Sequence, residues 1–381
     1  MFFEDVISLT QKLISFNTVN PEGNEDDIAR FVGVLLESHG FKVDYQKFEE
    51  KRLSVIAEKG VDGNRPPIVL TGHFDTVPLG EKPWKEEPFL GTLKDGKIYG
   101  RGSSDMKGGL AAMICAAVQA SQKSTPPGGI RLIFTAAEEP GCHGALHLVE
   151  TGYNLGMAGA IIVGEPTSNT PAIGHKGALY LNVSASGKTA HSSMPELGEN
   201  AIYKAARAIT KIENFQFRAD LDDLHGFPTI NVGLVKGGKN LNSVPDHAEF
   251  TIDIRSTSKI KHAEILARLS KELGNEIKIK KLVDLPPVSS TETSSFIQSV
   301  YAVCGIDPEK GAHQKSLPYM TDGAVLHQLY GGVPTVILGP GQPEMAHQTD
   351  EFCYIDKIEE AVRIYKNIIL KYGGISDGKF S

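Results

Sequence analysis

The sequence has few cysteines and no long hydrophobic run. Its four cysteines are far apart in 381 residues and form no CxxC pair, so neither a disulfide framework nor a thiolate zinc site is indicated. No apolar run approaches the roughly 18–20 residues of a membrane span. The N-terminus, MFFEDVISLT, carries acidic residues where a signal peptide needs basic ones. We therefore expect a soluble cytoplasmic protein from a reducing compartment, with no membrane association.

A large excess of one charge is also absent. The chain has 46 acidic and 39 basic residues and a net charge of -7, which gives no electrostatic reason to bind nucleic acid. Hydrophobic residues make up 40% and charged residues 22%, close to globular averages, which argues against a disordered or fibrous chain. The length predicts two or three domains.

Short apolar runs alternate with helical stretches in the first part of the chain. Continuous apolar runs at residues 68–70, 130–134 and 160–163 are typical of strands buried on both faces, and another run follows at 335–338. Apolar residues at helical spacing predict a helix at 107–119. This alternation predicts a layered α/β domain with a mostly parallel sheet.

The middle of the chain has a different pattern. Between residues 179 and 282, predicted strands and helices follow in the order β-α-β-β-α-β, which is the split ferredoxin-like pattern. The α/β pattern resumes at about residue 291. We therefore expect an inserted α+β domain at residues 178–290 and an α/β domain made of residues 1–177 and 291–381.

Candidate metal-binding side chains follow the predicted strands. His73 and Asp75 follow the first buried run, Glu138 and Glu139 follow the second, and Glu165 follows the third. Each signal alone is more typical of an ordinary surface loop. However, ligands of open α/β sheets bind outside the carboxyl ends of the strands, so we expect these side chains to lie together. Asp75 could accept a hydrogen bond from a nitrogen of His73 or lie behind it.

Two further candidates complete the set. Asp105 lies in the glycine-rich segment GRGSSDMKGG, where it replaces the third glycine of a dinucleotide-binding loop. A carboxylate at that place disfavours a phosphate and favours a cation. His347 lies in the late segment AHQTDE. Crowded carboxylates would repel one another, and two divalent cations would relieve this repulsion. Two histidines with three carboxylates, one of them bridging, match the preference of zinc, although cobalt or manganese could use the same ligands.

Five ordered segments resemble a known family. LTGHFDTVP, YGRGSSDMKGGLAAM, FTAAEEPG, VGEPTS and AHQTDE occur in this order and spacing in the co-catalytic zinc deacylases and exopeptidases. That family includes acetylornithine deacetylase, succinyl-diaminopimelate desuccinylase, aminoacylase and glutamate carboxypeptidase. The resemblance covers essentially the whole chain. It implies a zinc-exopeptidase-like α/β catalytic domain, two Zn²⁺ per subunit, and an inserted ferredoxin-like lid domain through which the protein forms a homodimer.

The resemblance also implies which residues bind the metals. It implies that His73 and Glu165 bind one zinc, that Glu139 and His347 bind the other, and that Asp105 bridges both.

Further roles follow from the same resemblance. It implies that Glu138 is the general base and that Asp75 supports the first histidine ligand. His191, in the segment GKTAHSS, would reach the partner subunit's active site and help to stabilise the oxyanion. Cys142 lies in the loop after the two glutamates, where it could be an inert thiol or a soft ligand near zinc.

Substrate residues are assigned in the same way. Asn242 and Arg255 match residues that hold a substrate carboxylate, and a guanidinium can pair with a carboxylate through two parallel hydrogen bonds. Thr321 and Gly323, in the segment MTDG, match a substrate-binding loop of the desuccinylase.

The implied reaction is hydrolysis of the amide bond of an N-acyl amino acid. The segments GEPTS and AHQTDE look closer to acetylornithine deacetylase, so N-acetyl-L-ornithine is the first candidate substrate. The MTDG segment favours N-succinyl-diaminopimelate, which stays an alternative. A dipeptidase, carboxypeptidase or aminoacylase that uses the same metals also stays open.

Overall fold

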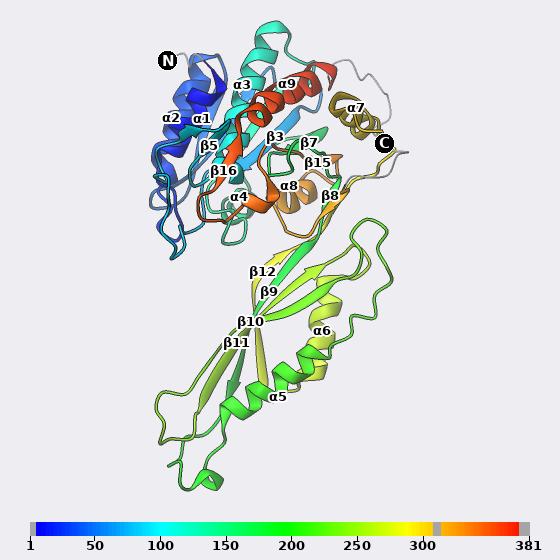
Figure 1. Cartoon of the computed structure of the whole chain (residues 1–381). Coiled ribbons are helices and arrows are strands. Elements are labelled where there is room, and N and C mark those ends of the chain that lie inside the picture. Colours follow the sequence, from blue (N-terminus) through cyan, green and yellow to red (C-terminus); the bar gives the residue numbers. More distant parts are fainter. Residues whose placement is uncertain (1–4, 308–313, 373–381) are drawn as a thin grey trace. The chain divides into compact units, whose positions relative to one another are not determined.

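The computed structural model describes residues 5–307 and 314–372, and the chain forms two compact units (Figure 1). The α/β unit contains Met1–Gly174, Ser290–Lys315 and Thr321–Ser381, whereas the inserted unit contains His175–Ser289 and Ser316–Met320. The sequence pattern predicts Ser316–Met320 to be part of the α/β domain. This segment groups instead with the inserted unit because the backbone N–H of Lys176 donates to the carbonyl of Leu317.

A six-stranded sheet forms the centre of the α/β unit. Across the sheet the order is β1 (Lys42–Glu49), β2 (Arg52–Lys59), β6 (Ile130–Thr135), β3 (Ile68–His73), β7 (Ala160–Val163) and β15 (Thr335–Ile337). The last four strands run parallel, and β1 and β2 form an antiparallel hairpin at the other side. Every residue of β3 and β6 is buried, as expected for strands covered on both faces.

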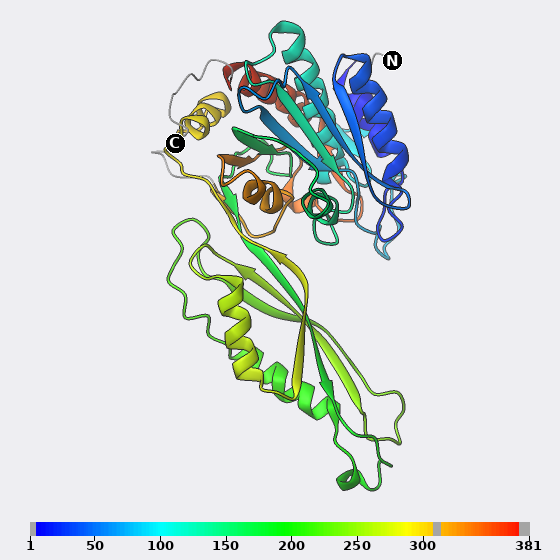
Figure 2. The same cartoon turned by 180° about the vertical axis from the view of Figure 1, so that it is seen from behind.

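Helices cover both faces of this sheet (Figures 1 and 2). Side chains of β1 show the two faces, because successive residues of a strand point in opposite directions. On one face, the centroid of the Tyr45 ring lies 5.9 Å from Cζ of Arg30, which belongs to α2 (Glu25–Ser38). Phe48 packs instead on His143 and His147 of α4 (His143–Glu150).

The remaining helices of the α/β unit pack against one another, and a second, smaller sheet is also present. Helix α3 (Gly108–Lys123) packs against α9 (Ile355–Tyr372), and both contact α1 (Val6–Ile14). Helix α7 (Ser295–Cys304) also contacts α9, and α8 (Gly323–Leu329) contacts α4. A small sheet contains β4 (Thr92–Lys94), β5 (Lys97–Tyr99) and β16 (Phe352–Tyr354).

The inserted unit has the predicted ferredoxin-like order. Its antiparallel sheet is arranged as β10 (Thr229–Gly237), β11 (His247–Ser256), β9 (Gly177–Ser186) and β12 (Ile277–Leu285). Helices α5 (Ala201–Glu213) and α6 (His262–Leu273) pack on one face of it. Short strands β8 (Gly174–His175), β13 (Val288–Ser289) and β14 (Ser316–Leu317) pair with one another.

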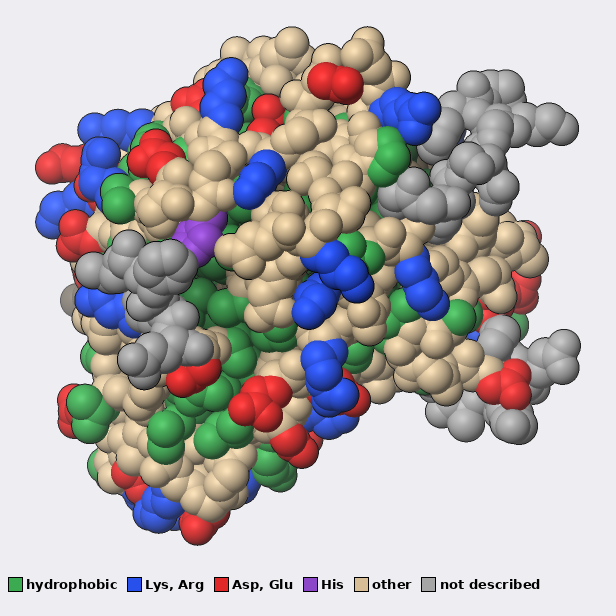
Figure 3. All heavy atoms as spheres, turned by 90° about the horizontal axis from the view of Figure 1, so that it is seen from above, with side chains coloured by type: hydrophobic (Ala, Val, Ile, Leu, Met, Phe, Trp, Pro, Cys, Tyr) green, Lys and Arg blue, Asp and Glu red, His purple; other side chains and the backbone are tan. Residues whose placement is uncertain are grey.

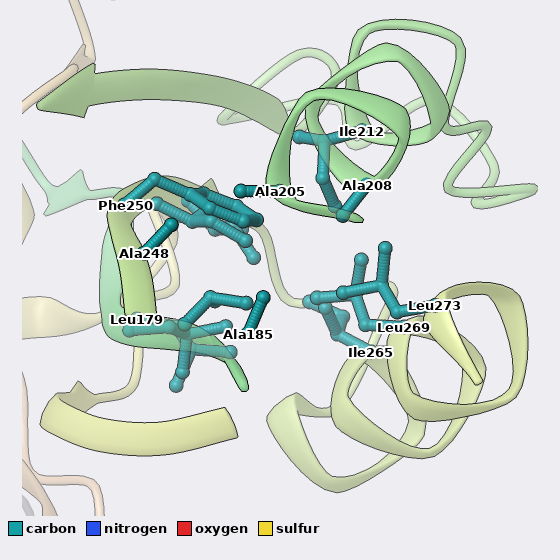
Figure 4. Packing of buried hydrophobic residues seen from close by; sticks show 14 of the residues in the cluster. Leu179, Ala185, Ala205, Ala208, Ile212, Ala248, Phe250, Ile265, Leu269 and Leu273 are labelled. Atoms are coloured by element: carbon teal, nitrogen blue, oxygen red, sulfur yellow. The ribbon is translucent and has the colours of Figure 1, made fainter. Parts of the chain in front are cut away.

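The core of the inserted unit lies between one face of its sheet and the two helices (Figure 4). Every second residue of β11 is buried, so that Phe250 and its neighbours face the helices. Ala205 and Ile212 lie on the buried face of α5, and Leu269 lies on that of α6. The predicted fold class, an α/β domain with an inserted α+β domain, is confirmed.

The surface carries charges of both signs. On the face drawn in Figure 3, the Lys and Arg side chains of the described residues are interspersed with Asp and Glu. Within residues 5–307 and 314–372, no helix has the length and apolar character needed to cross a membrane.

Candidate metal centre

The carboxyl ends of the parallel strands bring the predicted ligands to one edge of the sheet. His73 is the last residue of β3, and it pairs with Thr135, the last residue of β6. Strand β7 pairs with β3 on the other side and ends at Val163, two residues before Glu165. Glu138 follows β6 by three residues. These side chains therefore begin at nearly the same level of the sheet.

A close approach of two backbones brings Asp105 to the same edge. Asp105 lies in the segment Ser103–Lys107, where its own backbone is not helical (φ -124°, ψ 93°), and this segment leads directly into α3. A Cβ added to Gly109 would lie 2.5 Å from the carbonyl oxygen of Gly164, so only glycine lets α3 begin this close to the end of β7. Asp105 is thereby held beside the glutamate that follows Gly164.

The first group of potential ligands contains His73, Asp105 and Glu165. Nε2 of His73 lies 3.2 Å from Oδ1 of Asp105 and 3.6 Å from Oε1 of Glu165. Nδ1 of His73 lies 2.9 Å from the carbonyl oxygen of Asp75, which can only accept a hydrogen bond. In the neutral ring we therefore assign the proton to Nδ1, which leaves Nε2, beside the two carboxylates, able to bind a cation.

The second group contains Asp105, Glu139 and His347. Nε2 of His347 lies 3.1 Å from Oε2 of Glu139 and 3.4 Å from Oδ2 of Asp105. The two oxygens of Asp105 thus face different histidines. Within each group the ligand atoms lie within 4.8 Å of one another. This arrangement fits two cations that share one bridging carboxylate.

The electrostatics of the groups also fit cations. Hydrogen bonds with Asp105 and Glu139 raise the pKa of His347 to about 10. Burial raises the pKa of Glu165 well above its usual range, and the charge of Asp105 raises it further. The site therefore favours added positive charge. Two divalent ions would bring +4 against the -3 of the three ligand carboxylates, and the donor set of imidazoles and carboxylates suits zinc.

Asp75 orients the turn that carries both glutamates. Its carboxylate accepts hydrogen bonds from the backbone N–H groups of Glu138, at 2.9 Å, and Glu139, at 3.1 Å. The same carboxylate lies 3.6 Å from Nδ1 of His73, which is longer than a hydrogen bond. Asp75 therefore accepts the hydrogen bond of His73 through its backbone carbonyl, and its carboxylate lies behind the histidine. The amide of Asn20 donates to the same carboxylate at 2.8 Å.

Glu351 holds the Asp105 turn, a role that the sequence did not reveal. Its fully buried carboxylate accepts hydrogen bonds from the backbone N–H groups of Gly102, Ser104 and Asp105 at 2.8–3.0 Å. Arg101 donates to the same carboxylate at 2.7 Å. The only signal in the sequence was its position as the last acid of the AHQTDE segment. Its partners lie about 250 residues earlier in the chain, so spacing could not identify them.

Replacement of Glu351 by glutamine is expected to destabilise the protein by about 3–5 kcal/mol, because it leaves the buried guanidinium of Arg101 without its counter-ion. Urea unfolding would measure the loss. Glu344→Gln, at an exposed position just before the AHQTDE segment, is the matched control and should cost less than about 0.5 kcal/mol. Equal stability of the Glu351 variant and the wild type would show that this carboxylate does not hold the turn.

Asp322 is a second residue that reasoning from the sequence missed. It lies between Thr321 and Gly323, which were assigned to substrate binding, at the beginning of α8. The backbone N–H of Gly323 donates to the hydroxyl of Thr321 at 3.0 Å. The carboxylate of Asp322 is buried and accepts a hydrogen bond from the hydroxyl of Thr135. Burial raises the pKa of Asp322 to about 6.

The other predicted site residues belong to the inserted unit. His191 and Asn242 are exposed and lie on neighbouring segments, since the backbones at His191 and Ser243 form a β-bridge. Arg255 pairs with Asp253 through Nε at 2.9 Å and Nη2 at 3.0 Å. A substrate carboxylate would therefore have to share or displace this partner.

Comparisons with known proteins identify relatives over the whole chain. The model of peptidase family M20/M25/M40 matches residues 69–371. A protein of Staphylococcus aureus named probable succinyl-diaminopimelate desuccinylase is 30% identical, and the match covers 97% of this chain and 98% of the relative. The acetylornithine deacetylase of Myxococcus xanthus is 31% identical, and that match covers 89% of this chain and 90% of the relative.

Solved structures show the same fold. An M20 family metallo-carboxypeptidase from Sulfolobus solfataricus superimposes with a TM-score of 0.80 at 20% identity, covering 98% of this chain and 100% of the other. A dinuclear metal-binding peptidase of the M20 family from Bacillus subtilis superimposes with a TM-score of 0.69 at 18% identity, covering 96% of this chain and 97% of the other.

Proposed function

The chain belongs to peptidase family M20/M25/M40, and from this premise we propose that it hydrolyses the amide bond of an N-acyl amino acid with the help of two bound divalent cations. The observation that carries this proposal is the pair of ligand groups that share Asp105, with Glu138 buried on the neighbouring turn. Similarity to relatives named as a desuccinylase and a deacetylase supports the acyl amino acid as the substrate class.

Five side chains are proposed to hold the cations. We assign His73 and Glu165 to one ion, Glu139 and His347 to the other, and Asp105 to both, with Zn²⁺ as the resident metal. Cobalt and manganese could use the same ligands. When bound, two such ions supply Lewis acidity toward a carbonyl oxygen and lower the pKa of a water molecule. The similarity to the Bacillus subtilis protein, which is a dinuclear metal-binding peptidase, supports two ions per chain.

Glu138 is proposed as the general base. Burial raises the pKa of its carboxyl group, and the carboxylates of Glu165 and Asp322 raise it further, although His73 lowers it. A carboxylate with a raised pKa can take a proton from the attacking water and return it to the leaving amine. The hydrogen bond from its backbone N–H to Asp75 orients the residue for both transfers.

His191 is proposed to donate to the oxyanion in the active site of a second copy of the chain. The backbone N–H of Ser193 donates to Nδ1 of His191 at 3.2 Å, so the neutral ring carries its proton on Nε2. That N–H is the donor an oxyanion needs. Asn242 and Arg255 are proposed to hold the substrate carboxylate, and Thr321 and Gly323 to contact the acyl amino acid.

Two substrates are the leading candidates. N-acetyl-L-ornithine is the first, on the strength of the GEPTS and AHQTDE segments and the similarity to the Myxococcus xanthus enzyme. N-succinyl-diaminopimelate is the second, because the relative named as a probable desuccinylase matches 97% of the chain. A dipeptidase, carboxypeptidase or aminoacylase activity would use the same metal centre.

A hydrolysis panel tests the proposal. The purified protein, loaded with two equivalents of Zn²⁺ or Co²⁺, is incubated with N-acetylornithine, N-succinyl-diaminopimelate, N-acetylmethionine and a dipeptide. We expect cleavage of at least one acyl amino acid, loss of activity after chelation, and recovery on adding metal. Metal analysis should give two ions per chain. No cleavage of any substrate by the loaded protein would overturn the function.

Dimerisation through the inserted unit is a further part of this proposal. Tyr203 on α5 and Leu234 and Val235 on the edge strand β10 expose 60–65% of their surface.

Val235→Glu is expected to convert a dimer into a monomer and to lower kcat by about 10²–10³, the typical contribution of one oxyanion donor. Light scattering after gel filtration and steady-state kinetics would measure both. Val34→Glu, at an equally exposed apolar position in the α/β unit, is the control. A fully active monomer would exclude the proposed role of His191.

A further inference from the structure

A third group of potential ligands lies beside the proposed base. It consists of Glu138, Cys142 and Asp322, whose ligand atoms lie within 4.8 Å of one another. Glu138 follows β6, Cys142 immediately precedes α4, and Asp322 immediately precedes α8. All three residues are buried, and none belongs to the five ligands proposed above. We call this group the thiol-carboxylate cluster.

One carboxylate oxygen in the cluster has no hydrogen-bond donor of normal geometry. Asp322 is 1% exposed, and Oδ2 accepts a hydrogen bond from the hydroxyl of Thr135. Oδ1 is buried and accepts no hydrogen bond within the part of the chain that the structure describes. The thiol of Cys142, a weak donor, faces Asp322 closely enough to lower the pKa of that carboxyl group, and its sulfur lies 3.6 Å from Oε1 of Glu138. Since buried acceptors are almost always paired, this oxygen is available to a further donor or to a cation.

The donor set selects one class of ligand. One sulfur and two carboxylate oxygens suit a thiophilic divalent cation such as Zn²⁺ or Cd²⁺, whereas Mg²⁺ and Mn²⁺ prefer oxygen alone. Zinc binds sulfur at about 2.3 Å and oxygen at about 2.0–2.2 Å, so ligand atoms in a tetrahedral site lie roughly 3.3–3.8 Å apart. The spacing of at most 4.8 Å in the cluster needs only small side-chain movements to reach this geometry.

The charges are compatible with a third cation. Two divalent ions in the proposed centre bring +4 against three ligand carboxylates, which leaves +1. The cluster has three acidic groups of its own to set against a further divalent ion, so the third ion does not add to an unbalanced positive charge.

The backbone at Cys142 has a conformation that favours glycine. Its φ angle of 57° is in the left-handed region, where glycine is unstrained and a cysteine side chain is unfavourable. A glycine there would hold the same turn without strain.

We propose that Glu138, Cys142 and Asp322 form an inhibitory site for a third, thiophilic divalent cation. An ion bound there occupies the carboxylate of Glu138, which can then no longer take the proton of the attacking water. The inhibitory effect rests on the proposed function, because it requires Glu138 to be the base. The binding of the ion does not depend on that role.

The experiment begins with the protein loaded with two equivalents of Zn²⁺ and titrates it with Cd²⁺. We expect a third ion to bind with the ultraviolet charge-transfer band of a cadmium thiolate, and turnover to fall at least tenfold as the band grows. Mn²⁺ should produce neither effect. Cys142→Gly, which suits the positive φ angle, and Cys142→Ser, which keeps the size of the side chain, should each remove the band and the inhibition. Cys304→Ser is the matched control and should keep both, because Cys304 belongs to none of the ligand groups.

The outcomes separate the two proposals. Absence of the band in the wild type, or its persistence in both Cys142 variants, would overturn the third site whatever the activity. Retention of the band by a protein that hydrolyses no substrate would overturn the proposed function and leave the cation site in place. Inhibition that survives in both Cys142 variants would show that cadmium acts at the two-metal centre instead.

Discussion

Replacement of Glu138 by glutamine is expected to lower kcat by about 10³–10⁴ while leaving two metal ions bound. Glutamine has nearly the same shape, but its amide cannot accept the proton of the attacking water or pass it to the leaving amine. None of the five proposed metal ligands is altered, and the backbone N–H that donates to Asp75 is kept. Steady-state kinetics on the best substrate of the panel and metal analysis of the same sample would measure the two effects.

Glu150→Gln is the control for this experiment, because Glu150 is an exposed glutamate at the end of α4. It should keep full activity. The pH profile gives a second readout, since removal of the base should abolish the acidic limb of kcat, whereas a merely structural change would lower the whole profile. More than a few per cent of wild-type turnover in the Glu138 variant, with both metals present, would mean that another group is the base.

The sheet of the α/β unit was predictable because its strands are buried on both faces. The apolar runs at residues 68–70, 130–134 and 160–163 correspond to β3, β6 and β7, although β3 extends three residues further, to His73. No helix was predicted after residue 338, yet α9 packs on α3. The sequence signal for this helix is the helical spacing of the apolar residues Ile358, Ala361, Val362 and Tyr365, all of which are buried in α9.

The grouping of the site residues was predictable for the same reason. Parallel strands end at one edge, so residues that follow β3, β6 and β7 must meet there. The side chains that hold them in place were not predictable. Glu351 reaches the Asp105 turn from the other end of the chain, and Asn20 reaches Asp75 from before the first strand. These contacts depend on tertiary packing between segments whose spacing in the sequence carries no information.

Replacement of Asp105 by asparagine is expected to remove at least one of the two metal ions and to abolish measurable turnover. Its two carboxylate oxygens face His73 and His347 at 3.2 and 3.4 Å, so it is the one side chain common to both ligand groups. A unit charge about 4 Å from another contributes about 4 kcal/mol at an effective dielectric constant of 20, which is roughly 10³ in affinity, and the charge on each metal ion is twice as large. Asparagine removes this attraction from both ions at once.

Metal content after dialysis and the rise in melting temperature on adding Zn²⁺ would measure the loss. A ligand that binds only the folded state stabilises it by about 2.7 kcal/mol at a concentration of 100 times its Kd, so the wild type should gain stability with added metal and the variant should gain much less. Asp95→Asn, at an exposed turn between β4 and β5, is the control and should behave like the wild type. Two tightly bound ions in the Asp105 variant would show that the two ligand groups do not share a bridge, and each ion would then need a third ligand from elsewhere in the chain.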